Sequence, residues 1–341
     1  MKRNRLKISI ITPAYNAEEY IGRTIESIQT QTFSSYEHII IDDGSSDKTR
    51  TIVESYAKDD SRIHFIRQAN QGASVARNKG IELASGDYVT FVDGDDFVAE
   101  DMLEVLYNAA TSRDADLICF NKYIYRDVSQ EALQETWLYK TGILPQVFNP
   151  RRDISAFTFI FAPLSICTFL KRNFIEEHGL RFSERYRRNE DILFVTQAMV
   201  LANRASYIKR ELYYYRVGVG GNMSSTLDRH RDDGWMVMED LYNFLVANRL
   251  FTGNVKRSFN ILCHAILWHY VSNMGTYEGQ KYAFNKVKHV ARRLQLDKMK
   301  DPGDIYTDIN FYKEFRAIIS ETYDEYLWDR AQKSIQYENK L

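Results

Sequence analysis

The stretch that decides the fold is residues 88–97, which read YVTFVDGDDF. Its first five residues are mostly β-branched or aromatic, which predicts a short buried strand. Three carboxylates, Asp93, Asp95 and Asp96, follow within four positions, and charges so close cost free energy unless a cation or hydrogen-bond donors compensate them. Gly94 lets the backbone approach a ligand, and the alternate carboxylates can bind one oxygen-loving ion. The alternative, which this stretch alone leaves open, is a solvated acidic turn in which Asp95 or Asp96 caps the next helix.

Short apolar runs alternate with helical segments on both sides of this stretch. The runs 7–12, 38–41, 63–66 and 116–120 are typical of strands, and the segments between them place apolar residues on one helical face. Strands and helices that alternate in this way form βαβ units. The sequence therefore predicts an α/β fold with a doubly wound, mostly parallel sheet.

From about residue 229 onward, apolar residues recur at helical spacing. They include Trp235, Met238, Leu241, Tyr242 and Leu245, and further along Ala283, Val287, Val290 and Leu294. The pattern predicts an α/β domain over residues 1–228 and an all-helical module over residues 229–341. Residues 281–300 also carry seven Lys or Arg and one Asp. Such a helix either lies on an anionic membrane or is a surface helix whose apolar stripe is buried in the module, and we favour burial.

Composition excludes several classes of function. The formal net charge of -1 argues against a nucleic-acid-binding protein that works by bulk charge. Cys119, Cys167 and Cys263 have no paired spacing, so they fit a reducing cytoplasm better than disulfides or a zinc site. The basic N-terminus is not followed by an apolar run, so we expect neither a secretory signal nor a membrane span. A cytoplasmic protein is the expectation, with peripheral contact to the inner face of the membrane left open.

Carboxylates follow two of the expected strands and precede a later helix. Asp42 and Asp43 follow residues 38–41, Asp93 begins the acidic stretch, and Glu190 and Asp191 precede the apolar helix at residues 192–201. Carboxylates at strand ends suit a site for a phosphorylated ligand with a divalent ion. Hard oxygen ligands without a Cys/His set favour Mg²⁺ or Mn²⁺.

The roles of the charged residues beside helices have two interpretations each. Arg77 and Lys79, near the start of an expected helix, either face a phosphate or form a solvated helix face, and composition alone favours the solvated face. Glu190 and Asp191 are either catalytic carboxylates or a charge pair favoured by the helix dipole. Asp42 or Asp43 can accept a hydrogen bond from a nucleobase N–H or a ribose hydroxyl.

Five segments, in this order, resemble the motifs of family 2 glycosyltransferases with the GT-A fold. They are ISIITPAYN at 8–16, IDDGSSDKT at 41–49, NQGASVARNKG at 70–80, GDYVTFVDGDD at 86–96 and NED at 189–191. The resemblance implies an inverting transferase that uses a nucleotide sugar, most often UDP-linked, with Mn²⁺ or Mg²⁺. It implies a hexose or N-acetylhexosamine as the sugar and a glycan, glycoprotein or lipid-linked saccharide as the acceptor. Similar helical additions occur in bacterial enzymes that build capsules or glycosylate adhesins.

The resemblance also assigns roles to single residues. In the donor site, Pro13, Tyr15 and Asp43 would hold the nucleobase. Asn70 and Lys79 would lie along the uracil, ribose or phosphates, with Arg77 beside them. Asp93 would touch the ribose side and Asp95 would ligate the metal, with Asp93 as a second candidate ligand. Asp191 would be the general base, and Glu190 beside it would bind the acceptor or the sugar. An inverting transfer needs such a carboxylate to take the proton of the acceptor hydroxyl.

The chain departs from the family pattern at one place. Many relatives carry a metal-binding His after a Tyr-Tyr-Arg strand, but here Tyr214-Tyr215-Arg216 leads into the glycine-rich residues 217–222. Those residues form either a lid over the donor or a surface loop.

Two rival functions remain. A sugar-phosphate nucleotidyltransferase would need a glycine-rich N-terminal signature that the chain lacks. A non-catalytic nucleotide-sugar-binding partner of another transferase is opposed by the complete carboxylate set. The transferred sugar, the acceptor and the oligomeric state are not predicted.

Overall fold

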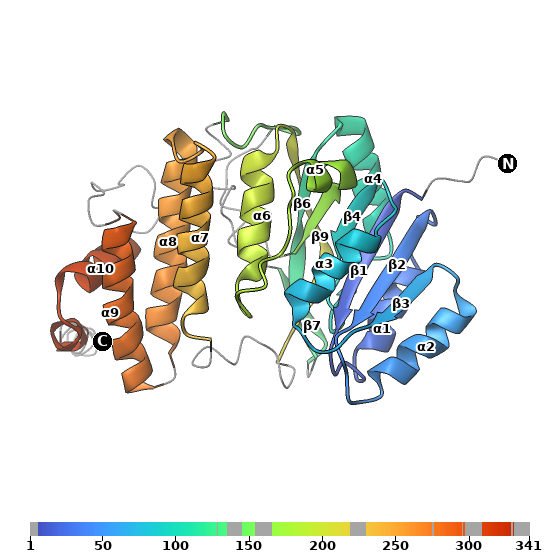
Figure 1. Cartoon of the computed structure of the whole chain (residues 1–341), viewed down its shortest axis with the longest axis horizontal. Coiled ribbons are helices and arrows are strands. Elements are labelled where there is room, and N and C mark those ends of the chain that lie inside the picture. Colours follow the sequence, from blue (N-terminus) through green and yellow to red (C-terminus); the bar gives the residue numbers. More distant parts are fainter. Residues whose placement is uncertain are drawn as a thin grey trace. The chain divides into compact units, whose positions relative to one another are not determined.

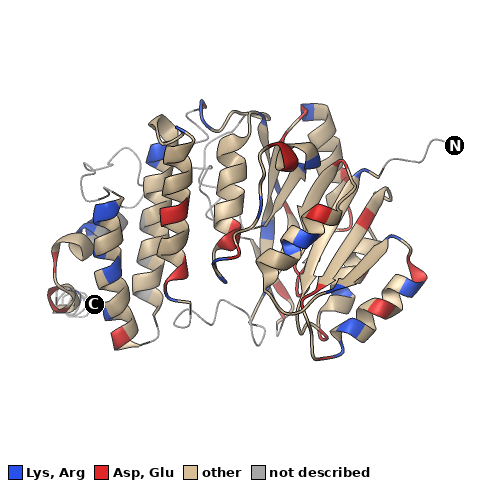
Figure 2. Cartoon of the chain, in the orientation of Figure 1, with Lys and Arg blue, Asp and Glu red and all other residues tan. Residues whose placement is uncertain are grey.

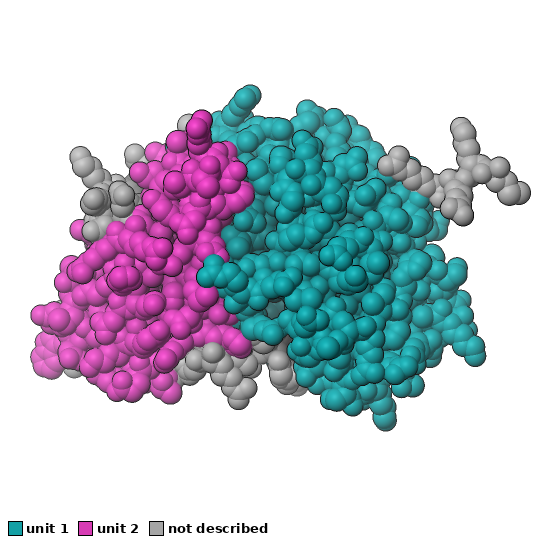
Figure 3. Space-filling view, viewed as in Figure 1, with its two compact units in different colours: residues 1–222, 253–255 teal, residues 223–252, 256–341 magenta. Residues whose placement is uncertain are grey.

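The computed structural model describes residues 6–127, 129–134, 145–153, 166–218, 230–274, 276–294, 296, 309–328 and 330. The chain divides into two compact units, residues 1–222 with 253–255 and residues 223–252 with 256–341 (Figure 3). The domain boundary expected after residue 228 stays a prediction, because residues 219–229 lie outside the described part.

The first unit is an α/β fold, as predicted, whose strands and helices alternate along the chain (Figure 1). The strands are β1 (Ile8–Ala14), β2 (Tyr36–Asp42), β3 (Ile63–Arg67), β4 (Tyr88–Phe91), β5 (Phe97–Val98), β6 (Leu117–Arg126), β7 (Glu131–Gln134), β8 (Thr168–Lys171) and β9 (Ala205–Val217). The helices are α1 (Ile21–Gln29), α2 (Thr49–Asp59), α3 (Ala73–Leu83), α4 (Met102–Arg113), α5 (Arg172–Glu177) and α6 (Glu190–Leu201).

These strands form one sheet with the order β3-β2-β1-β4-β8-β6-β9-β5, and β7 pairs with β6. The part built from β3, β2, β1 and β4 is parallel, as the βαβ pattern predicts. Beyond β4 the sheet is mixed, because β8 runs antiparallel to both β4 and β6 while β9 runs parallel to β6. The short strand β5 pairs antiparallel with β9 and thereby joins the end of the acidic stretch to that strand.

Helices cover both faces of the parallel part because side chains alternate along each strand. Ile40 packs with Ile21, Ile25 and Val53 from α1 and α2 in one apolar cluster. The opposite face carries Ile11, and a Cβ added to Gly80 of α3 would lie 2.3 Å from its side chain. A glycine at this point therefore allows α3 to lie directly on β1 and sets the height of that helix above the sheet.

The second unit is helical, with α7 (Asp233–Ala247), α8 (Gly253–Asn273), α9 (Tyr277–Arg293) and α10 (Ile309–Ser320). Most of the apolar positions predicted to form stripes are buried, among them Trp235 and Leu241 on α7 and Val287 and Val290 on α9. The apolar stripe of α9 packs inside the unit, as the favoured interpretation expects, and peripheral contact of the protein with a membrane stays a prediction. Of the helices described, none is long and apolar enough to span a bilayer.

Charged side chains of both signs are interspersed along the helices in the view of Figure 2. This mixing agrees with the formal net charge of -1. The three cysteines, Cys119, Cys167 and Cys263, are buried and free, as expected for apolar core positions.

Candidate active site

The acidic loop between β4 and β5 carries three carboxylates with different surroundings. The side chain of Asp93 is 26% exposed, Asp95 is half-buried and Asp96 is 1% exposed. Burial raises the pKa of Asp95 to about 6, and the neighbouring charge of Asp93 adds to the effect. Burial, together with Asp95 and Asp93, raises the pKa of Asp96 well above its usual value. The loop therefore concentrates negative charge that a cation would stabilise.

Backbone contacts to β1 fix the path of this loop. The amide N–H of Gly94 donates a 3.2 Å hydrogen bond to the carbonyl oxygen of Pro13. A Cβ added to Gly94 would lie 3.1 Å from that same oxygen, a tighter contact than side chains ordinarily make. The Thr24 hydroxyl donates to the carbonyl oxygens of Gly94 at 3.0 Å and Asp96 at 2.6 Å. Pro13, predicted as a nucleobase contact, is thus buried in β1 and also supports the acidic loop.

Strand β9 holds the acidic loop from the other side. The Tyr213 hydroxyl donates to the Asp96 carboxylate at 2.6 Å and accepts from the Asp93 amide at 3.1 Å. The Arg216 amide donates to the Asp96 carboxylate at 2.7 Å, and its guanidinium donates to the Asp95 carbonyl at 2.7 Å. Sequence reasoning named Asp96 only as part of the acidic stretch or as a helix cap, and it gave Tyr213 and Arg216 no role in the site.

The alternative that Asp95 or Asp96 caps the next helix is wrong. Helix α4 begins only at Met102, with Asp101 at its N-cap position. Asp96 instead accepts two hydrogen bonds from β9, which is why it tolerates burial. The sequence signal for this contact was the tyrosine-rich strand that ends in Arg216.

Arg77 of α3 joins two of the predicted carboxylate groups. Its Nη2 donates to Asp93 Oδ1 and its Nη1 to Glu190 Oε1, both at 2.8 Å. The Arg77 side chain is 5% exposed, so the solvated-face interpretation is wrong for this residue. Burial alone would lower the pKa of Arg77, but Asp93 and Glu190 raise it and keep the guanidinium charged. Lys79 is exposed and pairs with Glu82 at 3.2 Å, so the structure does not bring it into this cluster.

Glu190 and Asp191 occupy the first turn of α6, which starts after Asn189 in the left-handed region at φ 61°. Burial raises the pKa of Glu190, whereas Arg77 opposes the rise by pairing with it. Burial likewise raises the pKa of Asp191, again opposed by Arg77. The Asp191 carboxylate accepts from the Ile192 amide at 2.8 Å, and within the described residues it makes no ion pair. The two neighbours therefore differ, because Glu190 is held by a guanidinium and Asp191 is not.

Asp43 organises the loop that leads into α3. Its carboxylate accepts from the Gln68 side chain at 2.8 Å and from the amides of Gln71 at 2.8 Å and Gly72 at 2.7 Å. Gly72 has a φ of +97°, and Arg187 lies against it, donating to the Gln71 carbonyl at 2.7 Å. Asp43 is 3% exposed and is held by these hydrogen bonds. Its contact with a nucleobase stays a prediction.

The remaining residues expected in the donor site are accessible to a ligand. Tyr15, directly after β1, is 53% exposed, and Asn70 is exposed in the loop that Asp43 holds. Exposed aromatic rings beside a carboxylate loop can stack on a planar ligand. Both positions follow strands of the parallel part of the sheet, where such folds bind ligands.

The donor set at the acidic loop fits Mg²⁺ or Mn²⁺. Within the described residues, no Lys or Arg lies at ion-pair distance from the Asp95 carboxylate, whose charge is destabilised by burial and by Asp93. A divalent ion would relieve that repulsion, and carboxylate oxygens are the ligands that these ions prefer. Among all the residues that the structure describes, no group of three or more His, Cys, Asp or Glu side chains is placed to hold a metal. A divalent ion bound there would complete its coordination with oxygens from water or a ligand.

Comparison with known proteins agrees with this arrangement. The family model described as Glycosyl transferase family 2 matches residues 9–209. Glycosyltransferase GlyG of Streptococcus pneumoniae is 32% identical over 232 residues, which cover 65% of this chain and 74% of that protein. The cholesterol galactosyltransferase of Borreliella burgdorferi is 32% identical over 240 residues, covering 66% of this chain and 63% of that protein.

Solved structures share the fold at lower identity. Residues 1–349 of S. aureus TarS in complex with UDP-GlcNAc give a TM-score of 0.65 at 20% identity, covering 91% of this chain and 90% of that one. The mannosyltransferase PcManGT of Pyrobaculum calidifontis, in complex with GDP-Man and Mn²⁺, gives 0.57 at 16% identity, covering 95% and 88%. At these identities the likeness shows the GT-A fold with a helical addition and nothing of the substrate.

Proposed function

This chain belongs to glycosyl transferase family 2, and we propose that it transfers a hexose or N-acetylhexosamine from a UDP-sugar to an acceptor hydroxyl. The proposed acceptor is a bacterial glycan, glycoprotein or lipid-linked saccharide. The TarS neighbour was solved with UDP-GlcNAc, which makes a UDP-sugar the first donor class to test. The likeness to curated glycosyltransferases supports an enzyme that transfers sugars.

The observation that carries this proposal is the pairing of Arg77 with Asp93 and Glu190. Asp93 lies in the acidic loop, where the metal and the diphosphate would bind. Glu190 lies beside Asp191, where the acceptor hydroxyl would bind. One buried guanidinium contacts both carboxylates at 2.8 Å, so the leaving-group side and the acceptor side of a transfer reaction meet at one place.

The proposed mechanism is a single in-line displacement at the anomeric carbon, with inversion. Asp191 takes the proton of the acceptor hydroxyl as the hydroxyl oxygen attacks, because its carboxylate, unlike that of Glu190, is not paired with Arg77 and can accept the proton. Glu190, held by Arg77, orients the acceptor or the donor sugar beside it. Asp95 and Asp93 would hold the divalent ion. When bound, that ion would stabilise the negative charge of the departing diphosphate.

In the proposed donor site, the exposed residues recognise the nucleotide. Tyr15 stacks on the base that Pro13 and Asp43 border, and Asn70 contacts the uracil or the ribose. Lys79 reaches the phosphates only if its pairing with Glu82 opens, since that pair holds the ammonium at 3.2 Å.

The experiment that tests the proposal is donor hydrolysis by the purified full chain. A panel of UDP- and GDP-sugars is incubated with and without Mn²⁺, and the release of free nucleotide is followed. GDP-sugars belong in the panel because the PcManGT neighbour was solved with GDP-Man and Mn²⁺. We expect Mn²⁺-dependent release from one UDP-sugar. Release from a GDP-sugar alone would overturn the donor assignment, and metal-independent release would overturn the role of Asp95.

A matched pair of variants makes this experiment specific. Asp95→Ala should remove Mn²⁺-dependent release, whereas Asp101→Ala, which removes a carboxylate paired with Arg210 at the start of α4, should not. If no donor is hydrolysed, calorimetry with UDP and Mn²⁺ separates an acceptor-dependent enzyme from a chain without a nucleotide site. UDP binding without transfer to any saccharide would favour the rival function, a nucleotide-sugar-binding partner of another transferase.

A further inference from the structure

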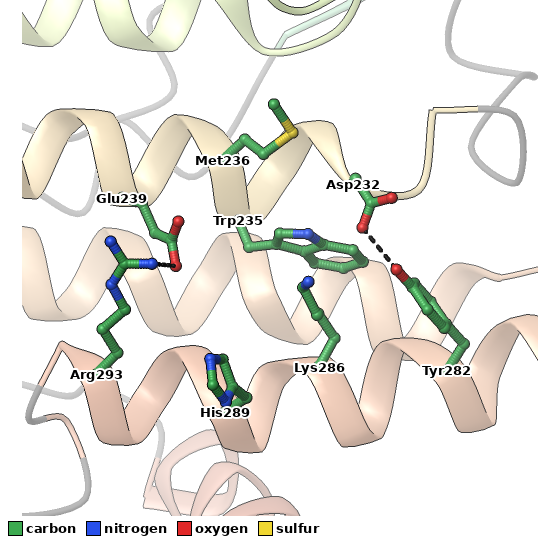
Figure 4. Close-up of a pocket in the computed structure, with 8 residues that line it drawn as sticks. All are labelled: Asp232, Trp235, Met236, Glu239, Tyr282, Lys286, His289 and Arg293. Carbon is green, nitrogen blue, oxygen red and sulfur yellow. Dashed lines mark hydrogen bonds and ion pairs between the residues drawn. The ribbon is translucent and has the colours of Figure 1, made fainter.

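A pocket in the helical unit, about 230 Å³ in volume, lies between α7 and α9 (Figure 4). Its lining includes two carboxylates, Asp232 and Glu239, and two permanent cations, Lys286 and Arg293. Arg293 pairs with Glu239 at 3.0 Å, and the Tyr282 hydroxyl donates to Asp232 at 2.8 Å. These charges balance, so the pocket favours neither an anion nor a cation. The contacts that α3 makes beside the candidate active site are more informative.

The segment that leads into α6 is fastened to α3 at both of its ends. At its start, the side chain of Asn78 donates to the carbonyl oxygen of Phe182 at 2.9 Å and accepts from the amide of the same residue at 2.8 Å. At its end, Arg77 donates to Glu190 at 2.8 Å. Arg77 and Asn78 are consecutive in α3, and both are buried. These contacts therefore hold the two ends of residues 182–190 on α3.

A third contact, made by Arg187, lies between these two ends. Its Nη1 donates at 2.7 Å to the carbonyl oxygen of Gln71, in the loop before α3. A Cβ added to Gly72 would lie 1.6 Å from that nitrogen and 2.8 Å from Cζ of Arg187. The guanidinium thus fills the space that a side chain at position 72 would need. The glycine, which also has a φ of +97°, is what allows Arg187 to reach the loop.

The loop that Arg187 contacts is the one that Asp43 organises. The Asp43 carboxylate accepts from the amides of Gln71 and Gly72 at 2.8 and 2.7 Å. The loop therefore gives two amide hydrogens to Asp43 and the carbonyl oxygen of Gln71 to Arg187. Since Asp43 is proposed to border the nucleobase, Arg187 joins the nucleobase side of the site to residues 182–190.

The proposed general base, Asp191, lies four positions after Arg187. Between them Asn189 adopts the left-handed region at φ 61°, so the chain changes direction before α6 begins. Further along α6, the ring of Phe194 stacks on that of Phe182 with centroids 4.0 Å apart, and both rings are buried. The body of α6 is thus packed independently of Arg187, whereas its first turn depends on the path of the chain just before it.

We propose that Arg187 is a positioning residue that couples the loop at residues 70–72 to the first turn of α6, and so sets the place of Asp191 relative to the nucleotide. The link itself rests on the contacts of Arg187, whereas its consequence for sugar transfer rests on the proposed function. Transfer rates respond to misplacements of about 1 Å, so one charge-assisted hydrogen bond at this point affects the rate.

Amide hydrogen exchange of the full chain, without ligands, tests the link itself. Arg187→Ala removes the contact, whereas the ammonium of Arg187→Lys can still donate to the Gln71 carbonyl. Arg181→Gln is the matched control, because it removes a nearby charge whose pair with Glu176, at 3.4 Å, is partly exposed. Thermal midpoints confirm that all variants fold.

We expect exchange at least threefold faster in Arg187→Ala, both in residues 70–74 and in residues 189–194. Arg187→Lys and Arg181→Gln should stay within twofold of the wild type. A residue with a purely local role would change one of the two segments. Faster exchange in only one segment, or in neither, therefore overturns the coupling.

Kinetics of sugar transfer test the consequence. Arg187→Ala should lower kcat at least fivefold and change KM for the UDP-sugar less than twofold, since Asp43 still holds the loop. Gly72→Ala, which displaces the guanidinium, should lower kcat by a smaller factor in Arg187→Ala than in the wild type, because the contact is already lost there.

An unchanged kcat in Arg187→Ala, a rise in KM alone, or equal factors for Gly72→Ala in both backgrounds overturns the positioning role. A wild-type chain that transfers no sugar would instead refute the proposed function. The exchange measurement would still decide whether Arg187 links the two segments, so the two failures are distinguishable.

Discussion

The hydroxyl of Tyr213 on β9 donates a 2.6 Å hydrogen bond to the carboxylate of Asp96 in the acidic loop. Both residues are almost fully buried, and the same hydroxyl accepts from the Asp93 amide at 3.1 Å. The Tyr213 side chain therefore holds both the backbone of Asp93 and the carboxylate of Asp96. This contact therefore helps to place the loop that carries the candidate metal ligands Asp93 and Asp95.

The variant Tyr213→Phe should weaken Mn²⁺ binding in the presence of UDP by about threefold to tenfold, because an outer hydrogen bond of the site is lost while the ring stays. Calorimetric titration of Mn²⁺ measures this change. Tyr214→Phe is the control, since the Tyr214 ring stacks on Phe97 with a centroid separation of 4.5 Å. Equal affinities in wild type and Tyr213→Phe would show that the loop does not depend on this bond.

Metal affinity should fall at acidic pH because the pKa of Asp95 is raised to about 6 by burial and by Asp93. Above pH 7 the carboxylate is ionised and the affinity is constant. Below pH 6 a proton competes with the cation, so the dissociation constant should rise about tenfold per pH unit for one competing proton. Mn²⁺ titrations from pH 5 to pH 8 test this expectation, and a constant value across that range would contradict it.

Replacing Arg77 by Met should destabilise the α/β unit by about 3–5 kcal/mol, because Asp93 and Glu190 would lose their shared buried partner. Lys79→Met, two residues further along α3, should cost less than about 1 kcal/mol, since its pair with Glu82 is exposed. Denaturant unfolding of the two variants gives the comparison. Similar losses would mean that the Arg77 pairs contribute little to stability.

Local patterns were sufficient to predict the parallel strands and the carboxylates at their ends. Residues 38–41 and 63–66 fall within β2 and β3, and the helical stripe that contains Leu241 is buried as expected. These features depend on spacing within a few residues, which the sequence displays directly. The match of five ordered segments to one family added the fold beyond β4, where apolar spacing no longer indicated the topology.

The contacts that hold the site could not be predicted in this way. Asp96 and Tyr213 are 117 positions apart, and their contact depends on the pairing of β5 with β9. Strand β9 pairs with β6 through irregular register near Asn121, so counting residues along either strand does not place Tyr213. The pairing of Arg77 with Asp93 and Glu190 could not be predicted either, because a charged residue near the start of a helix is usually solvated. The lid or surface loop expected at residues 217–222 lies outside the described residues except for Val217 and Gly218.

His38, in the core beneath α1 and α2, should make stability fall at acidic pH. Its Nε2 is 2.9 Å from the Thr12 hydroxyl, and burial lowers its pKa to about 3. The unfolded chain binds a proton near pH 6.5, whereas the folded chain does not, so stability is full above that pH and is lost as pH falls toward 3. Unfolding free energies should decline by about 1.4 kcal/mol per pH unit relative to His38→Leu, which lacks the titrating ring. Parallel curves for the two proteins would show that the pKa of His38 is the same in the folded and unfolded states.

Asp191 and Glu190 should respond differently to loss of charge if Asp191 is the general base. Asp191→Asn should keep UDP and Mn²⁺ binding within about twofold but lower the transfer rate by roughly 10²–10⁴, the usual contribution of a positioned base. Glu190→Gln should instead weaken folding, because it leaves half of the buried Arg77 guanidinium without its carboxylate. Since burial raises the pKa of Asp191, the rate should also decline on the acid side at a higher pH than for an ordinary carboxyl group. Transfer at the normal rate by Asp191→Asn, together with a folded but inactive Glu190→Gln, would move the role of base to Glu190.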